Sequence, residues 1–456
     1  MTSSRLAAPI RHVLDRLFPR GALLLSVLTF ASYGMGLVRD RIFARTYGAG
    51  SELDAYNAAF VLPELTLDVL VASGLAAPFI PILARLRREG DEIADAFARS
   101  VTTAVVLVMG AAAVVLFVAA PQTVDLIAPG FDAAERALYT DLFRVMAITP
   151  VIFAASIALG EVLVASHRFL FYGLAPILYN VGIIVGTVWL ADRLGIFAAA
   201  VGAVLGAALH LGIRIVGIAR TTFRYRPAFA VRTPAFREFV RLMVPKMLSH
   251  PVEPLTFLFF TAVASGLADG SVSAVSFARN FQSVPVSLIG VSFSLAVFPT
   301  LAAAYAAGDR AAFVGTLRRN LVTIGGLTVI AAFALFAVSG IVIELLLGGG
   351  AFDADDVART SLVLAAFAVS VPFDALAHPL ARAMYATHNT VLQVVASLAS
   401  LAAIVVVANA LVGSAGIVAI PLAFAAGSAV KVALLGIFLV PRIRRISPET
   451  AAALPG

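Results

Sequence analysis

The sequence predicts an all-α integral membrane protein with twelve transmembrane helices, and three observations lead to this fold class. Of the 456 residues, 61% are hydrophobic and only 13% are charged, with a mean hydropathy of +0.98. Soluble domains carry roughly 25% charged residues. Apolar runs of about 20 residues, enough to cross ~30 Å of hydrocarbon, recur along the whole chain. The runs show no strand-like alternation, which favours a helical bundle over a barrel.

The expected spans follow one another with short polar connections. In chain order they cover residues 21–44, 53–84, 98–127, 136–165, 169–191, 195–219, 238–267, 272–304, 315–347, 358–386, 390–413 and 415–441. Several exceed the length needed to cross a bilayer and several contain proline, which indicates tilted or bent helices.

Arginine placement predicts the orientation of the spans. One set of connections is rich in arginine, beginning with Arg5, Arg11, Arg16 and Arg20, whereas the opposite set holds mainly aspartate. Positively charged loops stay in the cytoplasm, so we expect both termini to be cytoplasmic in a bacterial cytoplasmic membrane. The basic residues that give the net charge of +7 lie in the connections between spans. This placement favours contact with the phospholipid bilayer and argues against binding of nucleic acid. No cleavage site follows the first apolar run, which predicts an uncleaved span.

Several chemistries are not expected from the composition. The chain has no cysteine, and its six histidines show no metal-binding spacing. No glycine-rich nucleotide loop is present. We therefore expect a transporter rather than an enzyme, with no metal or cofactor, driven by an ion gradient or the membrane potential.

The longest polar connection divides the chain into two halves. It predicts an N-lobe at 1–220 with spans 1–6, a basic cytoplasmic linker at 221–241, and a C-lobe at 242–456 with spans 7–12. EVLVASH at 161–167 aligns with RAMYATH at 382–388, and FIPILA at 79–84 resembles FPTLA at 298–302. Six spans per half give parallel repeats, which predicts two lobes around a central cavity that open alternately by rocking.

Charges within the first two spans are the strongest functional signal. Arg39, Asp40 and Asp54 lie inside or beside apolar stretches, where such a charge costs about 2.5–3.5 kcal/mol at a helix centre. They persist mainly where they face a water-filled cavity or a partner. Arg39 is thus a candidate anion-binding residue whose guanidinium Asp40 would hold in place. The alternative is that these charges form a cluster that anchors the span at the membrane interface. Asp54 is expected either to pair with Arg39 or to stabilise its helix N-terminus.

The second half supplies further candidates for the cavity. Arg279 and Asn280 lie in a polar patch at 276–283, which a lipid-facing wall would not contain. Lys246 and Glu253 share one helix face with His250, and Glu253 is a candidate for ion coupling as well as for substrate binding; an interfacial ion pair is the alternative.

Span 10 contains a second candidate for ion coupling. Asp374 and His378 are four residues apart and therefore lie on one helix face. Histidine titrates near neutrality, so the two residues form a candidate proton-responsive pair. Structural pairing is the alternative.

Three stretches together resemble a known family. GLVRDRIFARTYGAG at 36–50, DAYNAAFVLP at 54–63 and FARNFQSVP at 277–285 are similar to the MurJ/MviN family, which comprises lipid II flippases of the multidrug/oligosaccharidyl-lipid/polysaccharide (MOP) exporter superfamily. The similarity extends over about residues 20–390 in register.

The resemblance implies a MOP/MATE-like fold with a cavity formed by spans 1, 2, 7 and 8. Its arginines would bind the diphosphate of a polyprenyl-linked precursor, which suits a bidentate guanidinium. Arg39 aligns with a family arginine and Asp54 with a family acidic residue, whereas Tyr33 and Leu67 stand where family arginines are expected. The family's Asp-Arg pair in span 8 is replaced by Arg279-Asn280. Typical members have fourteen spans, and this chain is expected to be a shortened member with twelve.

We expect a flippase that moves a polyprenyl-diphosphate-linked cell-wall precursor from the inner to the outer leaflet by alternating access. Its expected partners are a lipid-linked saccharide diphosphate, the bilayer and, as candidates, cell-wall synthesis proteins. Three alternatives remain open: a flippase for another lipid-linked oligosaccharide, a MATE-like drug or ion antiporter, and a non-transporting membrane scaffold.

Overall fold

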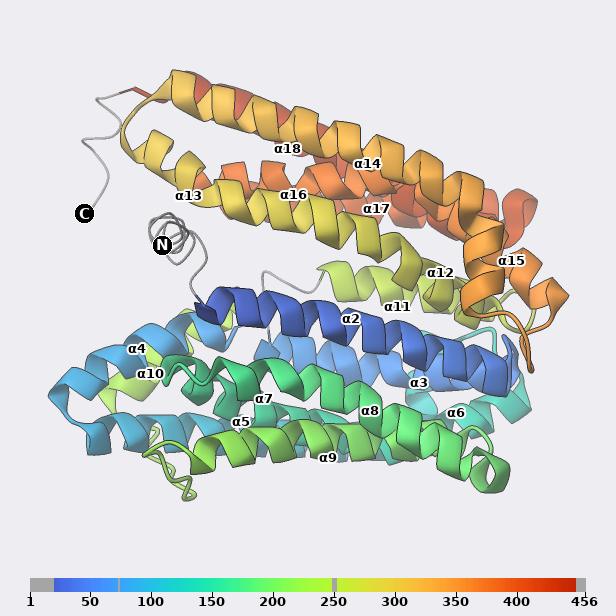
Figure 1. Cartoon of the computed structure of the whole chain (residues 1–456), viewed down its shortest axis with the longest axis horizontal. Helices are drawn as coiled ribbons and strands as arrows, with labels where there is room; N and C mark the ends of the chain where they lie inside the picture. The colour runs from blue at the N-terminus through green and yellow to red at the C-terminus, as the bar shows by residue number, and fades with distance from the viewer. Residues whose placement is uncertain (1–19, 73, 248–251, 448–456) are drawn as a thin grey trace, which may run out of the picture. The chain divides into compact units, whose positions relative to one another are not determined.

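The computed structural model describes residues 20–72, 74–247 and 252–447, and these ranges form helices joined by short connections (Figure 1). In chain order the elements are α2 (Arg20–Tyr47), α3 (Ser51–Leu67), the π-helix η1 (Asp68–Ala72), α4 (Ala76–Glu89), α5 (Asp91–Ile127), α6 (Ala133–Met146), α7 (Thr149–Ala165), α8 (Phe169–Leu194), α9 (Phe197–Ala219), α10 (Pro234–Met247), α11 (Val252–Ser265), α12 (Ser271–Pro285), the π-helix η2 (Val286–Val291), α13 (Ser292–Ala306), α14 (Arg310–Leu346), α15 (Ala354–Ala368), α16 (Val371–Ala386), α17 (Val391–Ala415), the 3₁₀-helix η3 (Gly416–Val418) and α18 (Ala419–Arg444). The predicted all-α class is confirmed.

Many of these helices are long and apolar enough to cross a membrane. Eight meet this condition in the described ranges, or up to ten when each bent helix pair counts as one span. One of the eight, Val391–Arg444, contains both α17 and α18, which pack against each other. The 28-residue α2 is not among the helices that meet the condition, so the twelve spans expected from the sequence stay a prediction. The first three N-terminal arginines lie outside the described residues.

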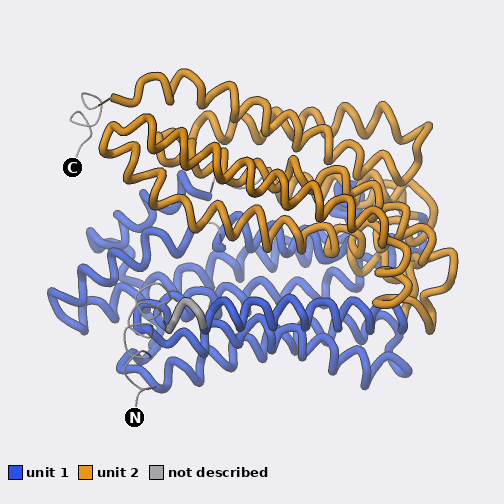
Figure 2. The backbone as a smooth tube through the Cα atoms, turned by 45° about the horizontal axis from the view of Figure 1, so that its top comes forward, with its two compact units in different colours: residues 1–46, 58–127, 132–251 blue, residues 47–57, 128–131, 252–456 orange. Residues whose placement is uncertain are grey.

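The chain folds into two compact units (Figure 2). Unit 1 comprises residues 1–46, 58–127 and 132–251, and unit 2 comprises residues 47–57, 128–131 and 252–456. Both units therefore contain sequence from the predicted N-lobe. The start of α3 belongs to unit 2, and α10, which begins within the predicted basic linker, belongs to unit 1.

Unit 1 is built around contacts among α4, α5, α7 and α9. Phe79 of α4 stacks on Phe97 of α5 with ring centroids 5.6 Å apart, and both side chains are buried. Helices α8 and α9 approach so closely that a Cβ at Gly182 would overlap the backbone of Gly206. Small residues at such a contact let helix backbones pack tightly in a membrane, where the hydrophobic effect does not drive helices together.

Unit 2 repeats this arrangement with different side chains. Leu301 of α13, Phe313 of α14 and Met384 of α16 form the centre of its main core, which Leu435 of α18 completes. Helix α14 is long and only its inner stripe is buried, as expected for a helix that faces lipid along most of its surface.

The internal repeat predicted from the sequence is visible in the backbone. Helices α5 and α14 are both 37 residues long. Asp132 caps α6 and Asp353 caps α15, and each accepts hydrogen bonds from backbone N–H groups of its helix. The π-helices η1 and η2 follow a proline-containing helix in each half.

Two histidines mark equivalent turns in the repeat. His167 follows α7 with φ 56° and His388 follows α16 with φ 55°, and they are the non-glycine residues with positive φ in the described part of the chain. This left-handed conformation normally favours glycine at the end of a helix. Its occurrence at the same place in both halves shows that the two turns share one backbone design.

The halves differ in length after the π-helices. Pro63 and Pro81 are farther apart in sequence than their counterparts Pro285 and Pro299. In unit 2 the chain passes directly from η2 into α13, whereas in unit 1 a turn that includes Gly74 precedes α4. The extra residues of the first half therefore interrupt its helix.

Candidate functional site

Arg39 lies on α2 of unit 1 with its guanidinium fixed by two neighbours. Its Nη2 and Nε donate to Asp40 Oδ1 at 2.8 and 3.1 Å, and its Nη1 donates to Asn180 Oδ1 of α8 at 3.3 Å. Asn180 is itself held by a bond from Nδ2 to the Pro176 carbonyl. Asp40 is buried, while 26% of the Arg39 side chain remains exposed. The result is a positioned cation with part of its surface open.

Asp54 has a different role from the pairing with Arg39 that the sequence suggested. Its carboxylate accepts hydrogen bonds from the backbone N–H groups of Gly270, Val272 and Ser273 and from Ser273 Oγ, at 2.6 to 3.3 Å. These donors lie at the N-terminus of α12, where a carboxylate is also favoured by the helix dipole. Asp54 is 3% exposed, so in this structure its oxygens are occupied by the protein itself.

Arg279 on α12 is the positioned cation of unit 2. Its Nη2 lies 3.6 Å from Glu253 Oε1, and its guanidinium carbon lies 3.3 Å from the centroid of the Phe257 ring. A second ring, Phe424, lies at 5.8 Å. The Arg279 side chain is 20% exposed and that of Glu253 is 79% exposed. Arg279 therefore rests on aromatic faces, with one weakly held carboxylate as its partner. The neighbouring Asn280 is half-buried.

The expected common face of Lys246 and Glu253 stays a prediction. Helix α10, with Lys246, ends at Met247 and belongs to unit 1, whereas α11, with Glu253, begins at Val252 and belongs to unit 2. The four residues that join the two helices lie outside the described ranges. His250 lies outside the described residues.

Asp374 and His378 are both on α16, but the hydrogen bond of Asp374 comes from another helix. Gln282 Nε2 of α12 lies 3.3 Å from Asp374 Oδ2 and 3.3 Å from Ser370 Oγ. Gln282 is completely buried, and Asp374 and His378 are half-buried. The sequence pattern identified the acidic residue but not the glutamine that contacts it.

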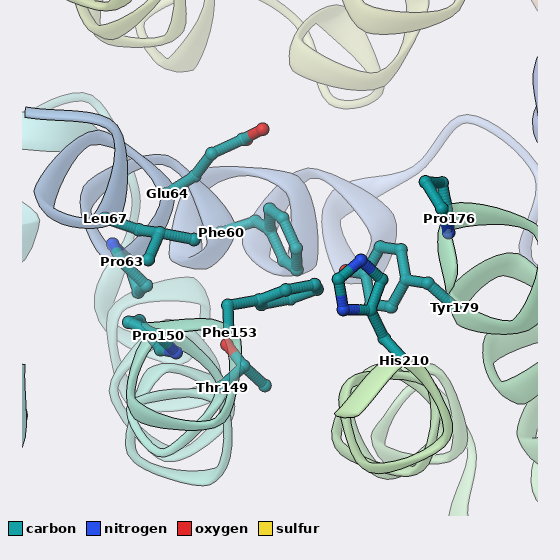
Figure 3. A pocket seen from close by; sticks show the side chains of 10 residues that line it. All are labelled: Phe60, Pro63, Glu64, Leu67, Thr149, Pro150, Phe153, Pro176, Tyr179 and His210. Atoms are coloured by element: carbon teal, nitrogen blue, oxygen red, sulfur yellow. The ribbon is translucent and has the colours of Figure 1, made fainter. Parts of the chain in front are cut away.

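Unit 1 contains a cavity that the sequence did not indicate. Its volume is about 210 Å³, and its lining is mainly apolar and aromatic. Figure 3 shows Phe60, Phe153, Tyr179 and His210 grouped around the space, whereas the carboxylate of Glu64 points away from it. Pro63, Leu67, Thr149, Pro150 and Pro176 complete the lining.

A buried polar cluster lies on the helices that line this cavity. His210 Nδ1 of α9 is 2.7 Å from Ser156 Oγ of α7. One helical turn farther along α9, Arg214 is 4% exposed and its guanidinium carbon lies 4.3 Å from the Tyr172 ring centroid. A Cβ at Gly160 would overlap the Arg214 guanidinium, so α7 accommodates the arginine only because glycine stands there.

The chemistry of these sites is electrostatic. Within the described ranges no group of three or more His, Cys, Asp or Glu side chains could hold a metal ion. Arg39 and Arg279 are instead partly exposed guanidiniums of defined orientation, a group that binds phosphate and carboxylate bidentately and stays charged at any working pH. Each unit thus contributes one cation that is suited to an anionic ligand.

Comparison with protein families gives one match, to the family described as "Lipid II flippase MurJ", over residues 43–453. The "Probable lipid II flippase MurJ" of Thermotoga maritima is 31% identical over 362 residues, which are 79% of this chain and 73% of that protein. The "Lipid II flippase MurJ" of Burkholderia cenocepacia is 26% identical over 379 residues, covering 81% and 73% of the two chains.

Solved structures show the same fold. A structure titled "Lipid II flippase MurJ, inward closed conformation" superposes with a TM-score of 0.80 at 23% identity, covering 94% of this chain and 91% of that one. An inward-facing multidrug resistance MATE family transporter of the MOP superfamily superposes with a TM-score of 0.75 at 14% identity, covering 96% and 100%. The MOP-type membrane fold predicted from the sequence is thereby confirmed.

Proposed function

Because this chain belongs to the MurJ family of lipid II flippases, we propose that it moves a lipid II-like precursor across the bacterial cytoplasmic membrane. The cargo would be a saccharide linked to a polyprenyl chain through a diphosphate, carried from the inner to the outer leaflet by alternating access. No covalent bond of the cargo changes. Both termini would lie in the cytoplasm, since arginine-rich connections flank them.

The observation that carries the proposal, beyond family membership, is the state of Arg39 and Arg279. Both guanidiniums are oriented by neighbours and both keep part of their surface exposed. A diphosphate offers more acceptor oxygens and more charge than the Asp40 or Glu253 carboxylate, so it would compete for the arginines. The contact of Arg279 with Glu253, at 3.6 Å, is the weaker of the two and would be exchanged more readily.

Rescue of a bacterial strain depleted of its essential lipid II flippase tests this function. The wild-type chain should restore growth, and Arg39→Ala and Arg279→Ala should each reduce rescue. Loss of one charged hydrogen-bonding group costs about 1.5–3 kcal/mol, which is roughly ten- to a hundredfold in binding. Arg39→Lys keeps the charge but not the bidentate geometry and should recover only part of the activity.

Arg85→Ala is the matched control for these variants. Arg85 pairs with Glu238 at 2.5 Å, and the two side chains are 51% and 40% exposed. An exposed ion pair of this kind contributes about 0–1 kcal/mol, so this variant should rescue as well as the wild type. Full rescue by an Arg39→Ala, Arg279→Ala double variant would disprove the role of the two arginines.

A flippase for another lipid-linked oligosaccharide is the second candidate function, and two residues favour it. Tyr33 and Leu67 stand where family arginines were expected, and the structure places Leu67 in the lining of the apolar cavity rather than in a cationic site. Native mass spectrometry of the lipid that co-purifies with the chain distinguishes the two cargoes. A bound lipid-linked sugar other than lipid II, together with failed rescue, would support this candidate.

A non-transporting scaffold is a third alternative, because Arg39 and Arg279 could be paired with carboxylates in such a protein too. Rescue separates that alternative from a flippase, because a scaffold would not restore precursor transport. A drug or ion antiporter is disfavoured by the two guanidiniums, which suit anions. Energy for transport would come from the membrane potential or an ion gradient.

A further inference from the structure

The hydrogen bonds around Gln282 in unit 2 define the orientation of its side-chain amide. Its Nε2 faces Ser370 Oγ and Asp374 Oδ2, each at 3.3 Å. The Ser370 hydroxyl already donates to the Phe367 carbonyl at 2.7 Å, so it can only accept from Gln282. An ionised Asp374 is likewise an acceptor. Both neighbours therefore require the NH₂ side of the amide.

The other side of the same amide has an unused acceptor. Gln282 is completely buried, and its Oε1 has no hydrogen-bond partner among the described residues. Burying an acceptor without a donor is unfavourable, and such exceptions call for an explanation. A second state, in which this oxygen is used, supplies one.

Protonation of Asp374 creates that state. A carboxylic acid has an O–H donor that a carboxylate lacks. Rotating the Gln282 amide by 180° would turn Oε1 toward Asp374, where it could accept from the new O–H, while Ser370 could turn its hydroxyl toward Oε1 as well. The glutamine can thus satisfy both forms of the carboxyl, first as a donor and then as an acceptor.

Asp54 shows what a site for only one form looks like. Three of its four donors are backbone N–H groups, which cannot reverse their direction. The backbone donors stabilise the carboxylate, and only the Ser273 hydroxyl could turn to accept from a protonated acid. Asp374 differs because its amide partner can present either a donor or an acceptor.

The charges around this site favour a proton over a metal cation. His378 lies one turn after Asp374, and the charged groups that act on it are Asp374 and Arg382 of α16, Glu253 of α11 and Lys431 of α18. Two of these neighbours are carboxylates and two are cations, so they give the site no net negative charge, and within the described ranges no group of three or more His, Cys, Asp or Glu side chains could hold a metal ion. A proton needs no shell of oxygen ligands and can be taken up by a single carboxylate oxygen.

We propose that Asp374 and Gln282 form a proton-binding site in unit 2 whose occupancy is coupled to transport. The coupling rests on the proposed flippase function. In the uptake step a hydronium ion gives its proton to a carboxylate oxygen of Asp374 and leaves as water, the hydrogen bond from Gln282 Nε2 breaks, and a hydrogen bond from the new O–H to Gln282 Oε1 forms. Release reverses these changes, so neither an oxidant nor a second reactant is needed.

Infrared difference spectroscopy of the purified full chain in lipid nanodiscs, titrated with pH, tests the site directly. The wild type should develop C=O bands of protonated carboxylic acids, and carbon-13 aspartate should shift those that belong to aspartates. Asp374→Asn should remove one component from them, which identifies the Asp374 band. Gln282→Met, which removes both donor and acceptor, should move the band because the acid loses its acceptor. Gln393→Met is the matched control, since the amide of Gln393 on α17 donates to Ser397 Oγ at 3.3 Å and not to Asp374, and it should leave the band in place.

Three results would overturn the proposal: no aspartate band in the wild type, aspartate bands that Asp374→Asn leaves unchanged, or an Asp374 band that Gln282→Met leaves unmoved. If Asp374→Asn does not fold, the labelled wild type and Gln282→Met still decide the question. The pH dependence of lipid flux in proteoliposomes then tests coupling, and it should be lost in Asp374→Asn. The spectra need no cargo, so a missing band with successful rescue refutes only the proton site, and a band with failed rescue refutes only the flippase function.

Discussion

The two halves of the chain share a backbone and differ in chemistry at one equivalent place. Thr149 and Phe153 on α7 line the cavity of unit 1, and their counterparts on α16 are Ser370 and Asp374. Phe60 of α3 corresponds in the same way to Gln282 of α12, because Pro63 and Pro285 mark the same point of the two helices. An aromatic-lined space in one half is thus a hydrogen-bonded network in the other.

The difference shows which features of a duplicated fold are constrained. Caps, π-helices and left-handed turns recur in both halves because they determine the course of the backbone. The side chains between the helices do not recur, since packing can be satisfied either by rings around a space or by polar groups that pair. Among these equivalent positions, Asp374 of unit 2 is therefore the one that carries a group able to exchange a proton.

Phe153→Asp should have the largest effect on this contrast. It removes a ring that contacts Tyr179 and His210 at 5.0 Å and puts a carboxylate beside an apolar cavity. We expect a loss of about 3–5 kcal/mol in the free energy of unfolding, measured by thermal unfolding in detergent. Phe153→Leu keeps the apolar lining and should lose less than about 1.5 kcal/mol. Equal stability of the two variants would mean that the cavity is hydrated, and the contrast between the halves would fail.

Gly160→Ala should have an intermediate effect. The new Cβ would overlap the guanidinium of Arg214, which the surrounding helices hold in place. Such overpacking costs about 1–3 kcal/mol, and the same unfolding assay measures it. Gly212→Ala is the control, because a Cβ there meets nothing within 4 Å and should be neutral or slightly stabilising.

A double variant tests the equivalence of the halves further. The counterparts of Gly160 and Arg214 in unit 2 are Ala381 and Leu435. Adding Arg214→Leu to Gly160→Ala should therefore relieve the overlap, so the two losses should not add. Additive losses would show that the two helix pairs do not pack alike.

His167→Gly and His388→Gly should have the smallest effects and should resemble each other. Glycine adopts the left-handed conformation without strain, which would stabilise each turn by up to about 1 kcal/mol. The loss of the ring contacts with Phe169 and Tyr305, at 5.7 and 5.8 Å, opposes that gain in both halves. Unfolding temperatures of the single variants measure the effect, and opposite signs would show that the turns are not equivalent.

The sequence was most informative where the signal is local. The match between 161–167 and 382–388 predicted the repeat, because a turn that ends in a left-handed residue leaves a short motif. Arg39 and Arg279 were found because charges are rare in apolar segments.

Other features depend on residues far apart in the chain and left no local pattern. The donors to Asp54 lie 216 to 219 residues away at the N-terminus of α12, so neither local alternative, pairing with Arg39 or stabilisation of its own helix N-terminus, indicated them. Gln282 has no distinguishing feature in the sequence, because its contact with Asp374 of α16 joins residues 92 positions apart.

The division of α3 has a consequence for how the chain can be cut. Its first residues, with Asp54, belong to unit 2, although they are encoded in the first half of the gene. A gene split within the basic linker would therefore yield two fragments. The first would carry Asp54 without α12, and the second would carry α12 without the carboxylate that accepts hydrogen bonds from its N-terminus. Neither fragment contains a whole unit, so the two fragments would have to be produced together. Their reassembly would require residues 47–57 of the first fragment to pack into unit 2 of the second.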